Sequence, residues 1–127
     1  MQRAEKKSVT GRKVYNMERA KYNITCRGNK PGTIEVKTVS GYVFNFSGLR
    51  FGITNKTPEG FTRGAWFITE LTSGYIASHA ANTRKAAIDL FIEEHRELIP
   101  QIKKGLEQIT TDANPGIMPK YEYLTVL

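Results

Sequence analysis

Residues 33–53, TIEVKTVSGYVFNFSGLRFGI, decide the fold of this chain. Apolar and polar side chains alternate along most of this stretch, and Tyr42, Phe44 and Phe46 fall on one face, as is typical of β-strands. Ser-Gly pairs at 40–41 and 47–48 interrupt the alternation and predict turns. We therefore expect three successive strands, over 33–39, 42–46 and 49–53.

A second hairpin and then a helix are predicted further along the chain. After a loop over 55–60 (NKTPEG), the β-prone segments 65–71 and 75–79 flank a Thr-Ser-Gly turn at 72–74. Either Asn82 or Thr83 can cap a helix that starts at about Arg84, because each side-chain oxygen can accept a free first-turn N–H.

The predicted helix carries one apolar stripe with helical spacing. Its members are Ile88, Phe91, Ile92, His95, Leu98, Ile99, Ile102, Leu106 and Ile109. Pro100 lies within the stripe and lacks the N–H that a helix hydrogen bond needs. We expect either a kink or a break in which Pro100 begins a second helix.

The two ends of the chain give less regular patterns. Residues 13–24 have apolar side chains at helical spacing, but 22–26 (YNITC) also fit a strand, so both alternatives stay open. Residues 28–32 (GNKPG) predict a turn. We expect 112–119 to be irregular and the β-prone segment 121–126 to return to the sheet as an edge strand.

These patterns predict an α+β fold. We expect a mostly antiparallel sheet of about four to six strands, packed against one long or proline-broken C-terminal helix, with a basic N-terminal arm. The arm should cover residues 1–30, partly flexible and with a short helix as one alternative. Residues 31–127 should form a single α+β domain, for which a chain of 127 residues is long enough.

Residues 1–30 hold all of the excess positive charge. Their net charge of +7 equals that of the whole chain, because residues 31–127 carry ten basic and ten acidic side chains. Only Glu5 and Glu18 oppose nine basic residues, which are Arg3, Lys6, Lys7, Arg12, Lys13, Arg19, Lys21, Arg27 and Lys30. A cationic segment on a neutral body predicts contact with a polyanion.

Several classes of protein are disfavoured. No apolar run approaches the about 20 residues that cross a bilayer, and no signal-peptide core follows the charged N-terminus. The single Cys26 excludes an internal disulfide and a multi-cysteine metal site. Motifs for nucleotide hydrolysis, serine hydrolysis or zinc catalysis are missing as well. We expect a cytoplasmic protein that contacts no membrane, has no catalytic residues and holds no cofactor or metal.

Residues 66–87 resemble parts of three known families. WFITEL at 66–71, GYIA at 74–77 and NTRKAA at 82–87 outline a strand, a glycine turn, a strand and a helix. The outline resembles the last half of double-stranded-RNA-binding domains, and it is similar to the arm-DNA-binding domains of phage-type integrases and to HicB-type antitoxins. The first resemblance implies that Arg84 and Lys85 contact phosphate. Because SHAA at 78–81 replaces the glycine-rich pattern of those RNA-binding domains, we assign no family.

Two sets of side chains have two interpretations each. Tyr42, Phe44 and Phe46 fit a platform on which bases stack, but an alternating aromatic strand is more often core, and the helix needs a surface to cover. Arg50 and Arg63 flank the loop over 55–60 and either extend a basic surface or are simply solvated.

The leading hypothesis is a small nucleic-acid-binding protein whose cationic arm contacts the phosphates of DNA, RNA or a nucleoprotein complex. The predicted contact residues are the nine basic residues of the arm together with Arg84 and Lys85. One alternative is a phage or mobile-element protein that inhibits a host nucleoprotein complex, in the manner of anti-CRISPR proteins. Another is a small enzyme that brings Cys26, His79 or His95 beside a carboxylate, with the thiol pKa of Cys26 lowered by its basic surroundings.

Overall fold

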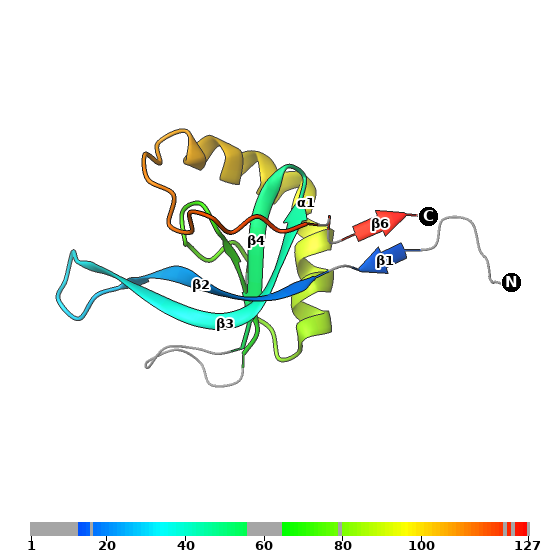
Figure 1. Cartoon of the computed structure of the whole chain (residues 1–127), viewed down its shortest axis with the longest axis horizontal. Coiled ribbons are helices and arrows are strands. Elements are labelled where there is room, and N and C mark those ends of the chain that lie inside the picture. Colours follow the sequence, from blue (N-terminus) through cyan, green and yellow to red (C-terminus); the bar gives the residue numbers. More distant parts are fainter. Residues whose placement is uncertain are drawn as a thin grey trace, which may run out of the picture.

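The computed structural model describes residues 13–15, 17–55, 65–78, 80–120, 122 and 124–126. Its elements in chain order are β1 (Lys13–Tyr15), β2 (Glu18–Arg27), β3 (Ile34–Phe46), β4 (Leu49–Thr54), β5 (Phe67–Glu70), α1 (Arg84–Leu106) and β6 (Leu124–Val126). Strands β2 to β5 form an antiparallel sheet in the order β2-β3-β4-β5, and α1 packs against it (Figure 1). The predicted α+β class is confirmed.

Strand β3 runs without interruption through the pair at 40–41, so the turn predicted there is wrong. A Cβ atom on Gly41 would lie 2.4 Å from the carbonyl oxygen of Ile53, which shows that glycine is needed for the close approach of β4 rather than for a turn. The turn predicted at 47–48 is confirmed, since Ser47 and Gly48 have φ values of 53° and 80° between β3 and β4. One long strand and one short one therefore replace the three expected.

One third of the segment predicted as an arm, ten of its thirty residues, belongs to the sheet. Residues Glu18–Arg27 form β2, which pairs with β3 from Glu18 opposite Val43 to Arg27 opposite Ile34. The strand alternative for 22–26 is therefore confirmed, and the helical alternative is wrong over these residues. Alternating burial explains the outcome, because Tyr22, Ile24 and Cys26 reach a core that a helix would not fill. The turn predicted at 28–32 connects β2 to β3.

Helix α1 begins where its capping pattern predicts. The Thr83 hydroxyl accepts a hydrogen bond from the Ala86 N–H at 3.0 Å, so Thr83 is the N-cap. The helix stays continuous through Pro100, and its ribbon changes direction along its length (Figure 1). The predicted kink therefore describes the helix better than the predicted break.

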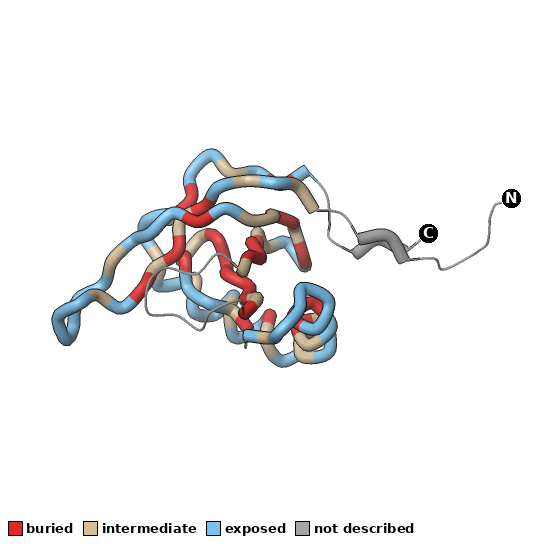
Figure 2. Tube along the Cα trace, turned by 90° about the horizontal axis from the view of Figure 1, so that it is seen from below, coloured by how far each residue is buried: buried red, intermediate tan, exposed pale blue. Residues whose placement is uncertain are grey.

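Two clusters of buried side chains cover the two faces of the sheet. On the α1 face, the Phe91 ring contacts those of Phe44 and Phe51 at centroid distances of 6.2 and 4.9 Å. The second cluster contains Tyr22, Ile24, Cys26, Val39, Val43, Phe67 and Leu71. Figure 2 shows this buried interior and the exposed end of the β2–β3 hairpin. The core interpretation is thus confirmed for Phe44 and Phe46, which are buried, whereas Tyr42 is only half-buried.

The segment that follows α1 closes the free edge of β2. The Asn114 amide accepts from the Asn23 N–H at 2.6 Å and donates to the carbonyls of Asn23 and Leu71 at 3.0 and 2.8 Å. The Thr25 N–H in turn donates to the carbonyl of Gly74 at 2.8 Å. The chain beyond β5, at one edge of the sheet, therefore lies against β2, the strand at the other edge.

Arg50 holds this C-terminal segment in place. Its guanidinium donates to both carboxylate oxygens of Asp112 at 2.7 Å and to the carbonyls of Asn114 and Ile117 at 2.9 and 2.7 Å. Because these bonds occupy the guanidinium, the hypothesis that Arg50 extends a basic surface is wrong. Arg63 lies outside the described residues.

Two predicted strands differ from expectation. Strand β6 pairs with β1 in a separate two-stranded sheet. Among the described residues of 121–126, Glu122 alone bridges to β3, at Asn45, so the predicted edge strand is not part of the main sheet. Within the described part of 75–79, Ile76 bridges to Thr69 and the Ala77 N–H donates to the Ile68 carbonyl at 2.7 Å, so isolated contacts along β5 take the place of the predicted second strand. Residues 112–120 are irregular, as predicted over 112–119.

Candidate functional site

Two arginines from distant parts of the chain meet at one aromatic ring. The guanidinium carbon of Arg19 lies 5.5 Å from the centre of the Tyr42 ring, and that of Arg84 lies 5.1 Å from it. Both distances are within the range of cation–π contacts, which contribute about 0.5–1 kcal/mol each at exposed positions. The structure thus unites one predicted residue of the arm with one of the helix start.

Strand register and helix capping place these side chains. Arg19 of β2 stands directly opposite Tyr42 of β3, and cross-strand partners project from the same face of a sheet. Arg84 is the first residue of α1, directly after its N-cap Thr83. The ends of two elements therefore converge on a ring that the sheet holds fixed.

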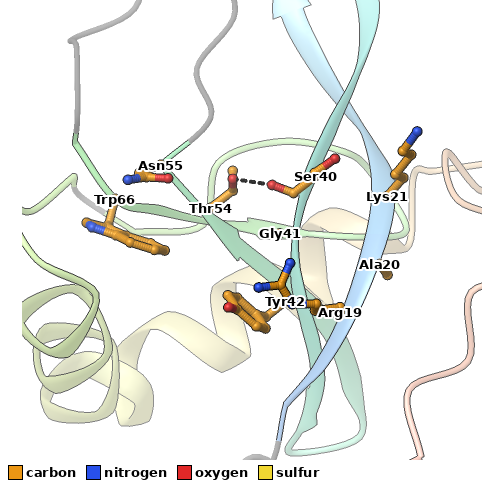
Figure 3. Close-up of a pocket in the computed structure, with 9 residues that line it drawn as sticks. All are labelled: Arg19, Ala20, Lys21, Ser40, Gly41, Tyr42, Thr54, Asn55 and Trp66. Atoms are coloured by element: carbon orange, nitrogen blue, oxygen red, sulfur yellow. Dashed lines mark hydrogen bonds between the residues drawn. The ribbon is translucent and has the colours of Figure 1, made fainter.

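A pocket of about 500 Å³ opens beside this ring (Figure 3). It lies between the β2–β3 pair, the end of β4 and the residue before β5, and it is lined by Arg19, Ala20, Lys21, Ser40, Gly41, Tyr42, Thr54, Asn55 and Trp66. The Thr54 hydroxyl donates to the Ser40 carbonyl at 2.6 Å across its wall. The lining thus combines two aromatic rings, polar groups and two cations.

The electrostatic character of this region is positive. Arg19, Lys21 and Arg84 are all exposed, and none of them forms an ion pair with another described residue. The first turn of α1 contains no acidic side chain, so its free N–H groups add partial positive charge. This combination favours an anion at the edge of the pocket.

The other predicted contact residues are dispersed. Arg27 and Lys30 are exposed at the end of the β2–β3 hairpin. Arg27 is eight residues from Arg19 along β2, which corresponds to about 26 Å at the usual rise per residue of a strand. Lys85 pairs with Asp89 at 2.7 Å on the helix surface. Lys13 lies in β1. The remaining predicted contacts, Arg3, Lys6, Lys7 and Arg12, lie outside the described residues.

The residues proposed for an enzyme are not united in the part of the chain that the structure describes. Cys26 belongs to the buried cluster on one face of the sheet. His95 lies on the other face, where the centroid of its ring is 5.5 Å from that of the Phe46 ring. Burial raises the pKa of the Cys26 thiol, and Glu35 adds to this while Lys37 opposes it, so the expected lowering is wrong. His79 lies outside the described residues, and the expectation that the chain is not an enzyme stays a prediction.

Among the pocket residues that the sequence did not indicate, Trp66 supplies the second aromatic ring. Its N–H and carbonyl bond the Ala81 backbone at 2.7 and 2.9 Å, which fixes it just before β5. The alternation of the strand places Trp66 on the same face as Ile68, and Ile68 packs against α1. That alternation was visible in the sequence, but the proximity of Tyr42 was not.

Comparisons of the chain with protein-family models, curated proteins and solved structures find no match. Among the described residues, no helix is both long and apolar enough to cross a bilayer, and no three His, Cys, Asp or Glu side chains gather as metal ligands.

Proposed function

We propose that the protein binds nucleic acid through the surface formed by Arg19, Tyr42 and Arg84, with Lys21 beside it. The observation that carries the proposal is the convergence of two exposed guanidinium groups on one aromatic ring, next to a pocket with a second aromatic wall. Neither guanidinium has a carboxylate partner among the described residues. Their charge is therefore available to a phosphate.

Arginine suits this role better than lysine. A guanidinium that stacks on a ring keeps N–H groups in its plane, and these can form two parallel hydrogen bonds with a phosphate. The Tyr42 ring restricts the orientations of Arg19 and Arg84 before any ligand arrives, which lowers the entropy lost on binding. The overall charge of +7 adds a long-range attraction to polyanions.

The proposal is tested by the salt dependence of binding. The double variant Arg19→Gln/Arg84→Gln should weaken binding of a labelled oligonucleotide and lower the magnitude of the log–log salt slope by about 1.4–1.8, because two phosphate contacts are lost. Lys103→Gln/Lys104→Gln is a matched control, since it removes the same charge from the far end of α1. Equal effects of the two double variants would show that only net charge matters and would contradict the proposed surface.

The contribution of the N-terminal segment needs a separate variant. A deletion of residues 1–30 would remove β2 from the sheet, so its effect on binding could not be separated from unfolding. A deletion of residues 1–12 leaves every described element in place and removes four of the predicted contacts. If this segment also binds phosphate, the deletion should reduce the salt slope further in the Arg19→Gln/Arg84→Gln background.

A second candidate function is protein binding through the β2–β3 hairpin. Ile34 and Val36 are 63 and 61% exposed on one face of β3, beyond the part of the sheet that α1 covers. Exposed apolar side chains on a projecting element favour a protein partner over a nucleic acid. A partner that survives nuclease treatment and is lost with Ile34→Ser/Val36→Ser, but not with Arg19→Gln/Arg84→Gln, would favour this function.

A further inference from the structure

The pocket beside Tyr42 is larger than phosphate contacts alone require. Its volume of about 500 Å³ lies within the range of about 300–1,000 Å³ that small-molecule sites occupy. The rings of Tyr42 in β3 and of Trp66, the residue before β5, both line it, although β3 and β5 are not neighbours in the sheet. The Tyr42 ring already carries the two guanidinium groups, so the Trp66 indole is the aromatic surface left for a ligand. A space of this size beside an indole fits a planar ring system.

The polar groups of the pocket complement the edge of such a ring. The Asn55 amide offers both a donor and an acceptor, and in Figure 3 it lies beside Trp66. The Thr54 hydroxyl, beside Asn55, already donates to the Ser40 carbonyl, which fixes this part of the wall. An aromatic ring such as Trp66 for the face of a base and an amide such as Asn55 for its edge are the elements by which proteins hold unpaired bases.

We propose that this pocket takes one unpaired base of a single-stranded nucleic acid, with the adjoining phosphates on Arg19 and Arg84. The inference rests on the proposed function and adds the form of the nucleic acid to it. In a duplex the faces of the bases are covered by stacking, so a duplex can reach the arginines but cannot fill the pocket. The protein should therefore prefer single strands.

Trp66 supplies a direct measurement, because it is the only tryptophan of the chain. A short single-stranded oligonucleotide should quench the Trp66 fluorescence of the unmodified protein on binding, since a base stacks on the indole. An abasic strand of the same length should bind through phosphate contacts without quenching, and so should a hairpin duplex. A free mononucleotide should quench only at much higher concentration, because it lacks the second phosphate contact.

The outcomes separate this inference from the proposed function. Quenching by the abasic strand or the duplex, or binding of the single strand without quenching, overturns the pocket assignment while leaving nucleic-acid binding intact. Quenching by the mononucleotide at the concentration of the oligonucleotide overturns the assignment to a strand. If none of the polymers binds, the proposed function itself fails.

A pair of substitutions provides an independent check. Trp66→Leu should weaken binding of the single strand by about 5- to 150-fold, the range expected for loss of one base–aromatic stack, and should leave the salt slope unchanged. Tyr75→Leu removes an aromatic ring that is 49% exposed and does not line this pocket, so it should leave affinity unchanged. Folding of both variants is verified by circular dichroism, and equal affinities of the two folded variants contradict the inference.

Discussion

The side chain of Asn114 forms hydrogen bonds with both backbone groups of Asn23, as a neighbouring strand would. It accepts from the Asn23 N–H at 2.6 Å and donates to the Asn23 carbonyl at 3.0 Å. Asn114 is itself 2% exposed, so removing its amide leaves buried backbone groups without partners. One side chain thereby protects the edge of β2, the strand that carries Arg19.

Asn114→Ala should lower the free energy of unfolding by about 2–4 kcal/mol, because three hydrogen bonds are lost from a buried position. Urea denaturation monitored by circular dichroism measures the change. Gln101→Ala, at an exposed position of α1, is the control and should shift the free energy by less than about 0.5 kcal/mol. A loss for Asn114→Ala as small as that of the control would contradict the role of the amide in closing the edge.

Much of the architecture was predictable because its determinants are local. Alternation along β3 and β4, the Ser47–Gly48 turn and the cap at Thr83 depend on residues close in sequence. Gly41 was misinterpreted because its environment is set by the Ile53 carbonyl of another strand. A glycine that permits close packing and a glycine that permits a turn have the same sequence signature.

The candidate site was only partly predictable, for a related reason. Arg19 and Arg84 were expected to be contact residues on charge alone, but their meeting at Tyr42 depends on the register between β2 and β3. A shift of one residue would turn Arg19 to the other face of the sheet. Asn114 lies in an irregular segment, whose sequence has no hydrophobic periodicity from which its contact with β2 could be predicted.

Acid should destabilise the fold through the contact between Asp112 and Arg50. Although partial burial acts to raise it, the pKa of Asp112 is lowered from its ordinary value of 3.8 by hydrogen bonds from Arg50 and the Asn114 N–H and by the Arg50 charge. A carboxyl group whose pKa is lower in the folded state than in the unfolded state stabilises the fold at pH values above its unfolded-state pKa. This stability is lost as the pH falls through the folded-state pKa. The advantage of wild type over Asp112→Asn should therefore be constant above about pH 5 and shrink below about pH 4.

The measurement is urea denaturation of both proteins across this pH range. Asp89→Asn is the control, because it removes a carboxylate from the exposed pair with Lys85 and should change the free energy of unfolding by less than about 0.5 kcal/mol. An advantage of wild type over Asp112→Asn that grows as the pH falls would contradict the assigned contact.

Cys26 should react slowly with thiol reagents while the protein is folded. Its side chain is 8% exposed, and burial raises the pKa of the thiol, so little thiolate is present near neutral pH. The rate with a disulfide reagent should increase strongly in urea, where the thiol is exposed and titrates normally. Equal rates in the folded and unfolded protein would show that Cys26 is accessible, and the hypothesis of a reactive thiol would then regain support.

The cap of α1 should be specific to one of two adjacent residues. Thr83→Ala should destabilise the protein by about 1 kcal/mol, because the Ala86 N–H loses its acceptor. Asn82→Ala is the matched control at an exposed neighbour and should have little effect. Thermal unfolding of the two variants distinguishes the alternatives. A larger loss of stability for Asn82→Ala than for Thr83→Ala would contradict the assignment of Thr83 as the N-cap.

Two glycine-to-alanine substitutions should change stability in opposite directions. A Cβ atom on Gly52 would lie 2.5 Å from the buried ring of Tyr22, so Gly52→Ala should cost about 1–3 kcal/mol through overpacking on the second face of the sheet. A Cβ atom on Gly105 would meet nothing within 4 Å, and alanine is favoured over glycine inside a helix by up to about 1 kcal/mol. Gly105→Ala should therefore stabilise the protein in the same urea titration. If Gly52→Ala proves neutral, Tyr22 must have another position available, and the packing described for this face would be wrong.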